Sequence, residues 1–121
     1  MSKYKFDHIH LMSPDPIKTA EFYQNMFDAI LVSSRDLGNG RFVINLNLGG
    51  VTMLISKATD EKQFGLAHFG IRTDHLEEAV DELKAKKVKF TREITEISPQ
   101  SKISFLQATE NVSIELQEGS L

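Results

Sequence analysis

The strongest constraint on the fold of this chain is an internal repeat, because the pattern βαβββ occurs twice. In the first half, alternating apolar residues predict a strand at Lys5–Met12, and helical spacing follows from Asp15, the expected N-cap, to Phe27. A glycine pair at 49–50 favours a hairpin between the last two of three further predicted strands, at 29–37, 41–48 and 51–57. We therefore expect a first module at about 5–57.

The second half repeats this order and predicts a second module at about 65–118. Its predicted elements are a strand at 66–73, a helix at 74–87 that Asp74 is expected to cap, and strands at 88–94, 103–108 and 112–118. Mixed helices and strands in this order predict an α+β fold. Residues 1–121 are expected to form one domain of two tandem modules.

Equivalent histidines strengthen the repeat. His8 lies seven residues before Asp15, and His68 lies six residues before Asp74. The predicted helices carry apolar residues at matching offsets, Ile17 and Ala20 in the first and Leu76 and Ala79 in the second. We expect His8 and His68 to occupy equivalent places in equivalent strands.

Polar residues gather on one face of the predicted strands, because alternate side chains of a strand share a face. These faces carry His8 and His10 in the first strand, His68 in the fifth and Glu115 in the last. Two imidazoles and a carboxylate suit a divalent ion such as Fe²⁺, Zn²⁺, Ni²⁺, Co²⁺ or Mn²⁺ and leave positions open for substrate. The alternative is a one-sided sheet whose polar face meets water, and the residues alone leave both interpretations open.

Composition argues against several other kinds of protein. The 121 residues are 40% hydrophobic and 26% charged, as expected of a folded domain. A formal net charge of −3 without an extended basic cluster argues against a nucleic-acid partner. No apolar run reaches the ~20 residues of a membrane span, and the N-terminus lacks the apolar stretch of a signal peptide. Because cysteine is absent, thiolate ligands are excluded, and we expect a cytoplasmic protein.

The segments that carry these residues resemble the vicinal oxygen chelate superfamily of glyoxalase I, methylmalonyl-CoA epimerase, extradiol dioxygenases and bleomycin-resistance proteins. Residues 7–27 are similar to its opening strand and helix, 67–88 to the start of its second module, and 112–118 to its closing strand. The resemblance implies mixed sheets that curl into a cup around one divalent ion, with ligand positions at His8, His68 and Glu115. It also implies a reaction in which the ion binds vicinal oxygens of a small substrate and stabilises an oxyanion.

One departure from the family pattern concerns the fourth ligand. In glyoxalase I and the epimerase this ligand is a glutamate or glutamine on the last strand of the first module, where this chain has Leu54. Leucine neither ligates nor transfers a proton, so both activities are in doubt, and the three-ligand set resembles that of the extradiol dioxygenases. We expect a metal-dependent lyase or dioxygenase. The alternative is a metal-free protein that sequesters a ligand, as bleomycin-resistance proteins do.

Several other residues have roles that the sequence leaves open. His10 is the candidate catalytic acid or base, and it could also line the cup or displace His8 as ligand if the strand register slips by two. Arg72 either holds an anionic substrate group or forms a salt bridge, Arg41 is similarly undecided, and His75 is expected on the surface. Open sheet edges predict a homodimer, and a small-molecule substrate is the other expected partner.

Overall fold

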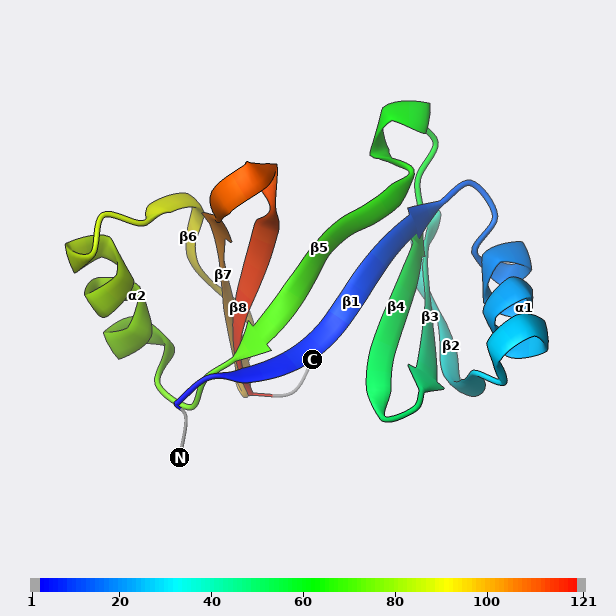
Figure 1. Ribbon diagram of the computed structural model, residues 1–121, viewed down its shortest axis with the longest axis horizontal. Helices are drawn as coiled ribbons and strands as arrows, with labels where there is room; N and C mark the ends of the chain where they lie inside the picture. The colour runs from blue at the N-terminus through cyan, green and yellow to red at the C-terminus, as the bar shows by residue number, and fades with distance from the viewer. Residues whose placement is uncertain (1–2, 120–121) are drawn as a thin grey trace. The chain divides into compact units, whose positions relative to one another are not determined.

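The computed structural model describes residues 3–119. These residues form eight strands, two α-helices and two short 3₁₀ turns (Figure 1). In chain order the elements are β1 (Lys5–Ser13), α1 (Pro16–Phe27), β2 (Ile30–Gly38), β3 (Arg41–Leu48), β4 (Val51–Lys57), η1 (Glu61–Gln63), β5 (Gly65–Arg72), α2 (Leu76–Ala85), β6 (Lys89–Ser98), β7 (Ser101–Gln107), η2 (Thr109–Asn111) and β8 (Ser113–Gly119). The described residues divide into two compact units, His8–Ala67 and residues 3–7 with 68–119.

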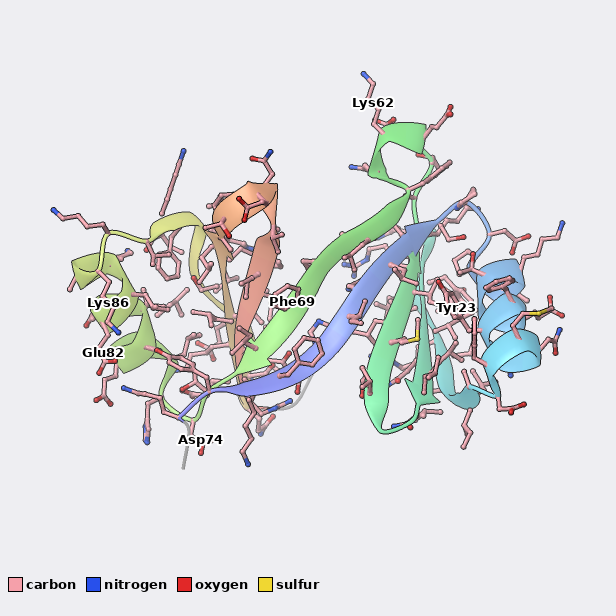
Figure 2. All side chains as sticks on the ribbon, viewed as in Figure 1. Tyr23, Lys62, Phe69, Asp74, Glu82 and Lys86 are labelled. Carbon is pink, nitrogen blue, oxygen red and sulfur yellow. The ribbon has the colours of Figure 1, made fainter. Side chains whose placement is uncertain are left out.

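The unit His8–Ala67 is a mixed four-stranded sheet with α1 packed against it (Figure 1). Its strand order is β2-β3-β4-β1, with β1 parallel to β4 and the other pairs antiparallel. Tyr23 of α1 packs against the apolar core of this unit (Figure 2). Alternation along β3 and β4 turns every second side chain toward the helix, so the core comprises Ala20, Ala29, Ile44, Leu46, Met53 and Ile55.

The other unit repeats this arrangement with α2. Its strand order is β5-β8-β7-β6, with β5 parallel to β8 and the other pairs antiparallel. Its core comprises Leu76, Val80, Leu106 and Leu116. The predicted α+β class, with two βαβββ modules and mixed sheets, is therefore confirmed. We call β1 to β4 with α1 module one, and β5 to β8 with α2 module two.

The start of the chain belongs to the unit of module two. The ring of Phe6 stacks on that of Phe69, which is labelled in Figure 2. The ring centroids are 5.5 Å apart. Lys3 Nζ lies 2.7 Å from a carboxylate oxygen of Glu82 on α2, and this ion pair raises the pKa of Lys3 and lowers that of Glu82. Residues before His8 thus support a helix and a strand that come more than sixty residues later.

Helix α1 begins as the sequence predicts, whereas α2 does not. The Asp15 side chain accepts a hydrogen bond from the Lys18 N–H at 3.2 Å, which is the expected N-cap contact. The predicted N-cap of α2, Asp74, is wrong, because His75 holds that position and its side chain makes no capping hydrogen bond. The Leu76 N–H in the first turn of α2 is satisfied from outside the helix.

That outside contact comes from the last strand of the unit. A carboxylate oxygen of Glu118 in β8 accepts a hydrogen bond from the Leu76 N–H at 2.8 Å. A negative charge at this end of a helix also interacts favourably with the helix dipole. The start of α2 is therefore determined by a residue 42 positions away.

Burial on the two helices corrects the expected alignment of the modules. Pro16 and Ala20 are buried in α1, whereas Ile17 is 57% exposed. In α2, Leu76 and Val80 are buried in the matching positions. The expected pairing of Ile17 with Leu76 is wrong by one residue. After this shift the two N-caps are sixty residues apart, as His8 and His68 are.

No helix within residues 3–119 combines the length and the hydropathy needed to cross a membrane. A cytoplasmic location and the assignment of residues 1–121 to one domain remain predictions.

Candidate metal centre

The first strand places two imidazoles on one face of module one. His8 is 1% exposed and His10 is half-buried two residues later. The ring centroids are 6.3 Å apart, and a ligating nitrogen of one ring lies within 4.8 Å of a ligating nitrogen of the other. His10 Nε2 lies 2.7 Å from Ser56 Oγ of β4, a hydrogen bond whose donor depends on the imidazole tautomer. His10 is therefore held in a fixed orientation by the neighbouring strand.

Strand register determines which residues of the two modules are equivalent. His10 pairs with Leu54 in the parallel pair β1–β4, and Gly70 pairs with Glu115 in the parallel pair β5–β8. The predicted equivalence of Leu54 and Glu115 is confirmed. The same pairing excludes a two-residue slip of β1, because His8 keeps the place in module one that His68 has in module two.

The two modules thus place their polar groups differently at this point. Module two carries its carboxylate on the last strand, at Glu115, and has Gly70 opposite it. Module one carries leucine on the last strand and an imidazole, His10, opposite it. Neighbouring strands are about 4.8 Å apart, so the His10 side chain stands beside that of Leu54.

Module two brings an imidazole and a carboxylate together in a largely buried place. His68 Nε2 lies 3.8 Å from Glu115 Oε1, and the two side chains are 13% and 9% exposed. This distance exceeds that of a hydrogen bond. It is within the separation of two ligands of one ion, which is at most about 4 Å when each bond is ~2.1 Å. The donor types and their spacing fit a divalent metal ion.

Two residues that sequence analysis did not identify orient these side chains. The ring of Phe105 meets that of His68 edge-on with centroids 5.2 Å apart, and Phe105 pairs with Glu115 in the antiparallel pair β7–β8. Ser56 orients His10 in the corresponding way. The available signal was period-two spacing, since Ser56 lies two residues beyond Leu54 and therefore on the same face of β4.

The remaining candidate residues are Arg72, His75 and Arg41. Arg72 donates to Asp7 Oδ1 at 3.0 Å and to the Gly119 carbonyl, so the salt-bridge alternative is the one that the structure shows. His75 is exposed at the start of α2, as predicted, and Arg41 is exposed at the start of β3. The structure brings His8 beside His10 in one unit and His68 beside Glu115 in the other. That both pairs bind one ion remains a prediction.

Solved structures of similar fold include an enzyme with a known reaction. A hypothetical protein from Bacillus halodurans C-125 has 20% identity over 99% of this chain and 97% of that chain, with a TM-score of 0.83. Methylmalonyl-CoA epimerase from Mycobacterium tuberculosis has 19% identity over 96% and 88%, with a TM-score of 0.77. A variant of the Streptomyces coelicolor methylmalonyl-CoA epimerase, in complex with 2-nitronate-propionyl-CoA, has 19% identity over 98% and 96%, with a TM-score of 0.78. At these identities the similarity establishes the fold alone.

Comparison by sequence gives the family. No curated protein matches the chain. The model of the Glyoxalase/Bleomycin resistance protein/Dioxygenase superfamily matches residues 5–116, which extend from β1 into β8. The chain therefore belongs to the Glyoxalase/Bleomycin resistance protein/Dioxygenase superfamily.

Proposed function

We propose that this protein is a metal-dependent enzyme in which His8, His68 and Glu115 bind one divalent ion. The observation that carries the proposal is the buried pair of His68 and Glu115, with Nε2 and Oε1 3.8 Å apart. Burial of a carboxylate is costly unless a cation or hydrogen bonds compensate it, and a divalent ion does so directly. His8 supports the proposal because it is buried at the equivalent place of module one.

The proposed chemistry is of the lyase or dioxygenase type, on a small substrate with neighbouring oxygen atoms. A bound divalent ion supplies Lewis-acid stabilisation of negative charge on those oxygens. His8 and His68 supply neutral nitrogen donors, and Glu115 offsets part of the charge of the dication. Phe105, packed edge-on against His68, would hold the imidazole ring in place.

We propose His10 as the group that gives or takes a proton. Its imidazole stands opposite Leu54, beside the position where four-ligand relatives have a carboxylate. An imidazole has an unperturbed pKa near 6.5 and exchanges protons readily at neutral pH. Ser56 Oγ, 2.7 Å from Nε2, would hold the ring in one orientation while it does so.

Methylmalonyl-CoA, the substrate named for the epimerase neighbours, is one candidate substrate because epimerisation needs both oxyanion stabilisation and proton transfer. It should be assayed beside a catechol and a glutathione hemithioacetal. Turnover of the catechol or of the hemithioacetal only with added metal would assign the reaction type within the proposal, whereas turnover of methylmalonyl-CoA would replace lyase or dioxygenase chemistry by epimerisation.

Elemental analysis of protein purified without chelator is the direct test. We expect about one divalent ion per chain in the wild type, a loss of at least tenfold in affinity for His68→Ala and for Glu115→Gln, and no loss for His75→Ala. His75 is the matched control, since it is an exposed histidine of the same module. A wild type that is metal-free and stays empty after reconstitution with Fe²⁺, Zn²⁺, Ni²⁺, Co²⁺ or Mn²⁺ would refute the proposal.

The second candidate function is a metal-free protein that sequesters a ligand, as bleomycin-resistance proteins do. Leu54 favours it, because one of the four expected ligand positions is apolar. Metal-dependent turnover of any substrate would decide against it. Metal-independent binding of a compound such as bleomycin by the empty protein would decide for it. In either case we expect a homodimer.

A further inference from the structure

The C-terminal half of α1 carries three aromatic rings that contact one another. The ring of Phe22 meets that of Tyr23 at 90°, with centroids 5.3 Å apart, and that of Phe27 at 70°, with centroids 6.1 Å apart. The centroids of Tyr23 and Phe27 are 6.3 Å apart. Tyr23 packs against the core, whereas Phe22 and Phe27 are 51% and 58% exposed. We call these three residues the α1 aromatic cluster.

The same end of α1 is electrically negative. The last carbonyl groups of a helix carry a partial negative charge, which basic residues in the last turn offset. α1 has no basic residue in its last turn, and its C-cap is Asp28, whose N–H donates to the Tyr23 carbonyl. The Asp28 carboxylate therefore adds a full negative charge beside the aromatic cluster. Because the faces of aromatic rings are also negative, all three features favour a cation.

Module two supplies such a cation from its own chain. In the sixty-residue alignment of the helices, residues 23–28 correspond to residues 83–88, which include Lys84, Lys86 and Lys87. Lys84 lies in the last turn of α2, and its Nζ is 5.6 Å from the centroid of the Phe90 ring. This distance is within the range of about 6 Å over which a cation is attracted to a ring. The end of α2 therefore has both the ring and the cation.

Module one has the rings without the cation. Within residues 3–119, no lysine or arginine lies over a ring of the α1 aromatic cluster. Lys18 is one turn before Phe22 on the same helix, yet it is exposed and makes no contact with that ring. The exposed ring faces are therefore free to receive a cation from outside the chain.

We propose that the α1 aromatic cluster, together with Asp28, binds the quaternary ammonium group of a small molecule. In the angle between two rings with centroids 5.3 or 6.1 Å apart, one cation can lie within about 6 Å of both centroids. A quaternary ammonium suits a half-exposed site better than a primary ammonium, because a primary ammonium is strongly hydrated. The carboxylate of Asp28 adds an attraction that depends on the charge of the ligand and not on its shape.

This site is separate from the candidate metal centre. Helix α1 packs on the face of the module one sheet that carries Ile55, whereas His10 stands beside Leu54 on the opposite face. Binding of a quaternary ammonium therefore needs no metal ion, and it is tested without one.

Titration with choline, followed by proton NMR, tests the proposal against an uncharged molecule of the same shape. The comparison compound is neohexanol, in which a carbon atom replaces the choline nitrogen. We expect choline to bind wild type in the millimolar range, with an upfield shift of its methyl resonance caused by the aromatic rings. Neohexanol should bind at least about tenfold more weakly, because it has no charge to interact with the rings or with Asp28.

Three substitutions locate the site. Phe22→Leu and Phe27→Leu should each raise the dissociation constant of choline about threefold or more, because leucine is apolar but has no ring face. Asp28→Asn should raise it as well, and asparagine tolerates the left-handed backbone conformation of Asp28. Phe64→Leu is the matched control, because Phe64 is a 38% exposed phenylalanine of the same unit outside the cluster. It should leave choline binding unchanged.

Circular dichroism should show that the variants remain folded, since Phe22 and Phe27 are exposed. Equal binding of choline and neohexanol would reveal an apolar surface without preference for a cation and would overturn the proposal. An unshifted choline resonance at high millimolar concentration would do the same, as would unchanged affinity in both folded phenylalanine variants. Weaker binding by Phe64→Leu would place the site elsewhere and also overturn it.

Discussion

Replacing Glu118 by alanine removes the contact that starts helix α2. The carboxylate accepts a hydrogen bond of 2.8 Å from the Leu76 N–H and places a negative charge at the positive end of the helix. Loss of a capping hydrogen bond costs about 0.5–2 kcal/mol, and loss of the favourable charge costs about 0.3–1 kcal/mol. The side chain is 29% exposed, so water replaces part of both interactions. We expect the free energy of unfolding to fall by about 1–2 kcal/mol.

Urea unfolding followed by circular dichroism measures this change, and two further variants separate its causes. Glu118→Gln keeps an acceptor oxygen and loses the charge, so it should cost only about 0.3–1 kcal/mol. Glu77→Ala removes an acid in the first turn of α2 itself, which is 74% exposed and binds Lys102 as Glu118 does, and it should cost less than about 0.5 kcal/mol. If Glu118→Ala and Glu77→Ala were equally mild, the capping role of Glu118 would be refuted.

Three other predictions concern the core and the site. Leu46→Ala should lower the free energy of unfolding by about 2–5 kcal/mol in the same urea assay, because Leu46 is fully buried, and a loss below about 1 kcal/mol would contradict this. Ser56→Ala should lower turnover about tenfold and shift the ¹⁵N resonances of the His10 ring, but leave metal affinity unchanged; unaltered ring resonances would exclude a positioning role. A divalent ion at about 100 times its dissociation constant should stabilise wild type by about 2.7 kcal/mol in calorimetry, and an equal gain for His68→Ala would contradict the ligand assignment.

The order of the elements was predictable because it depends on local patterns. Alternation in β3 and β4 and the turn glycines between them appear directly in the sequence, and Asp15 caps the helix that follows it. The start of α2 was not predictable, because it depends on Glu118, which folding brings to the helix from the last strand. An acidic residue just before a helical pattern usually marks the N-cap of the helix. At Asp74 this rule fails, because the helix begins where Glu118 accepts the hydrogen bond from the Leu76 N–H.

The candidate site was predictable in its residue types and less so in its geometry. His68 and Glu115 were identifiable because the repeat places them on polar faces of the two strands that pair in parallel. The contact of His10 with Ser56 and the edge-on contact of Phe105 with His68 depend on strand register and side-chain rotamers. Period-two spacing places Ser56 on the same face of β4 as Leu54, but only the three-dimensional arrangement shows that Ser56 and Phe105 contact the two histidines.

The two repeats are harder to separate than the sequence suggests, because the first residues of the chain pack against module two. A fragment beginning at Gly65 would contain all of β5, α2 and β6 to β8, yet it would lack Phe6, which stacks on Phe69, and Asp7, which pairs with Arg72. Expression of the second half alone should therefore give a weakened fold unless residues 3–7 are joined to it through a linker. The two compact units do not coincide with the two repeats, because residues 3–7 belong to the unit of module two, so dissection of this protein must follow its contacts and not its repeat boundary.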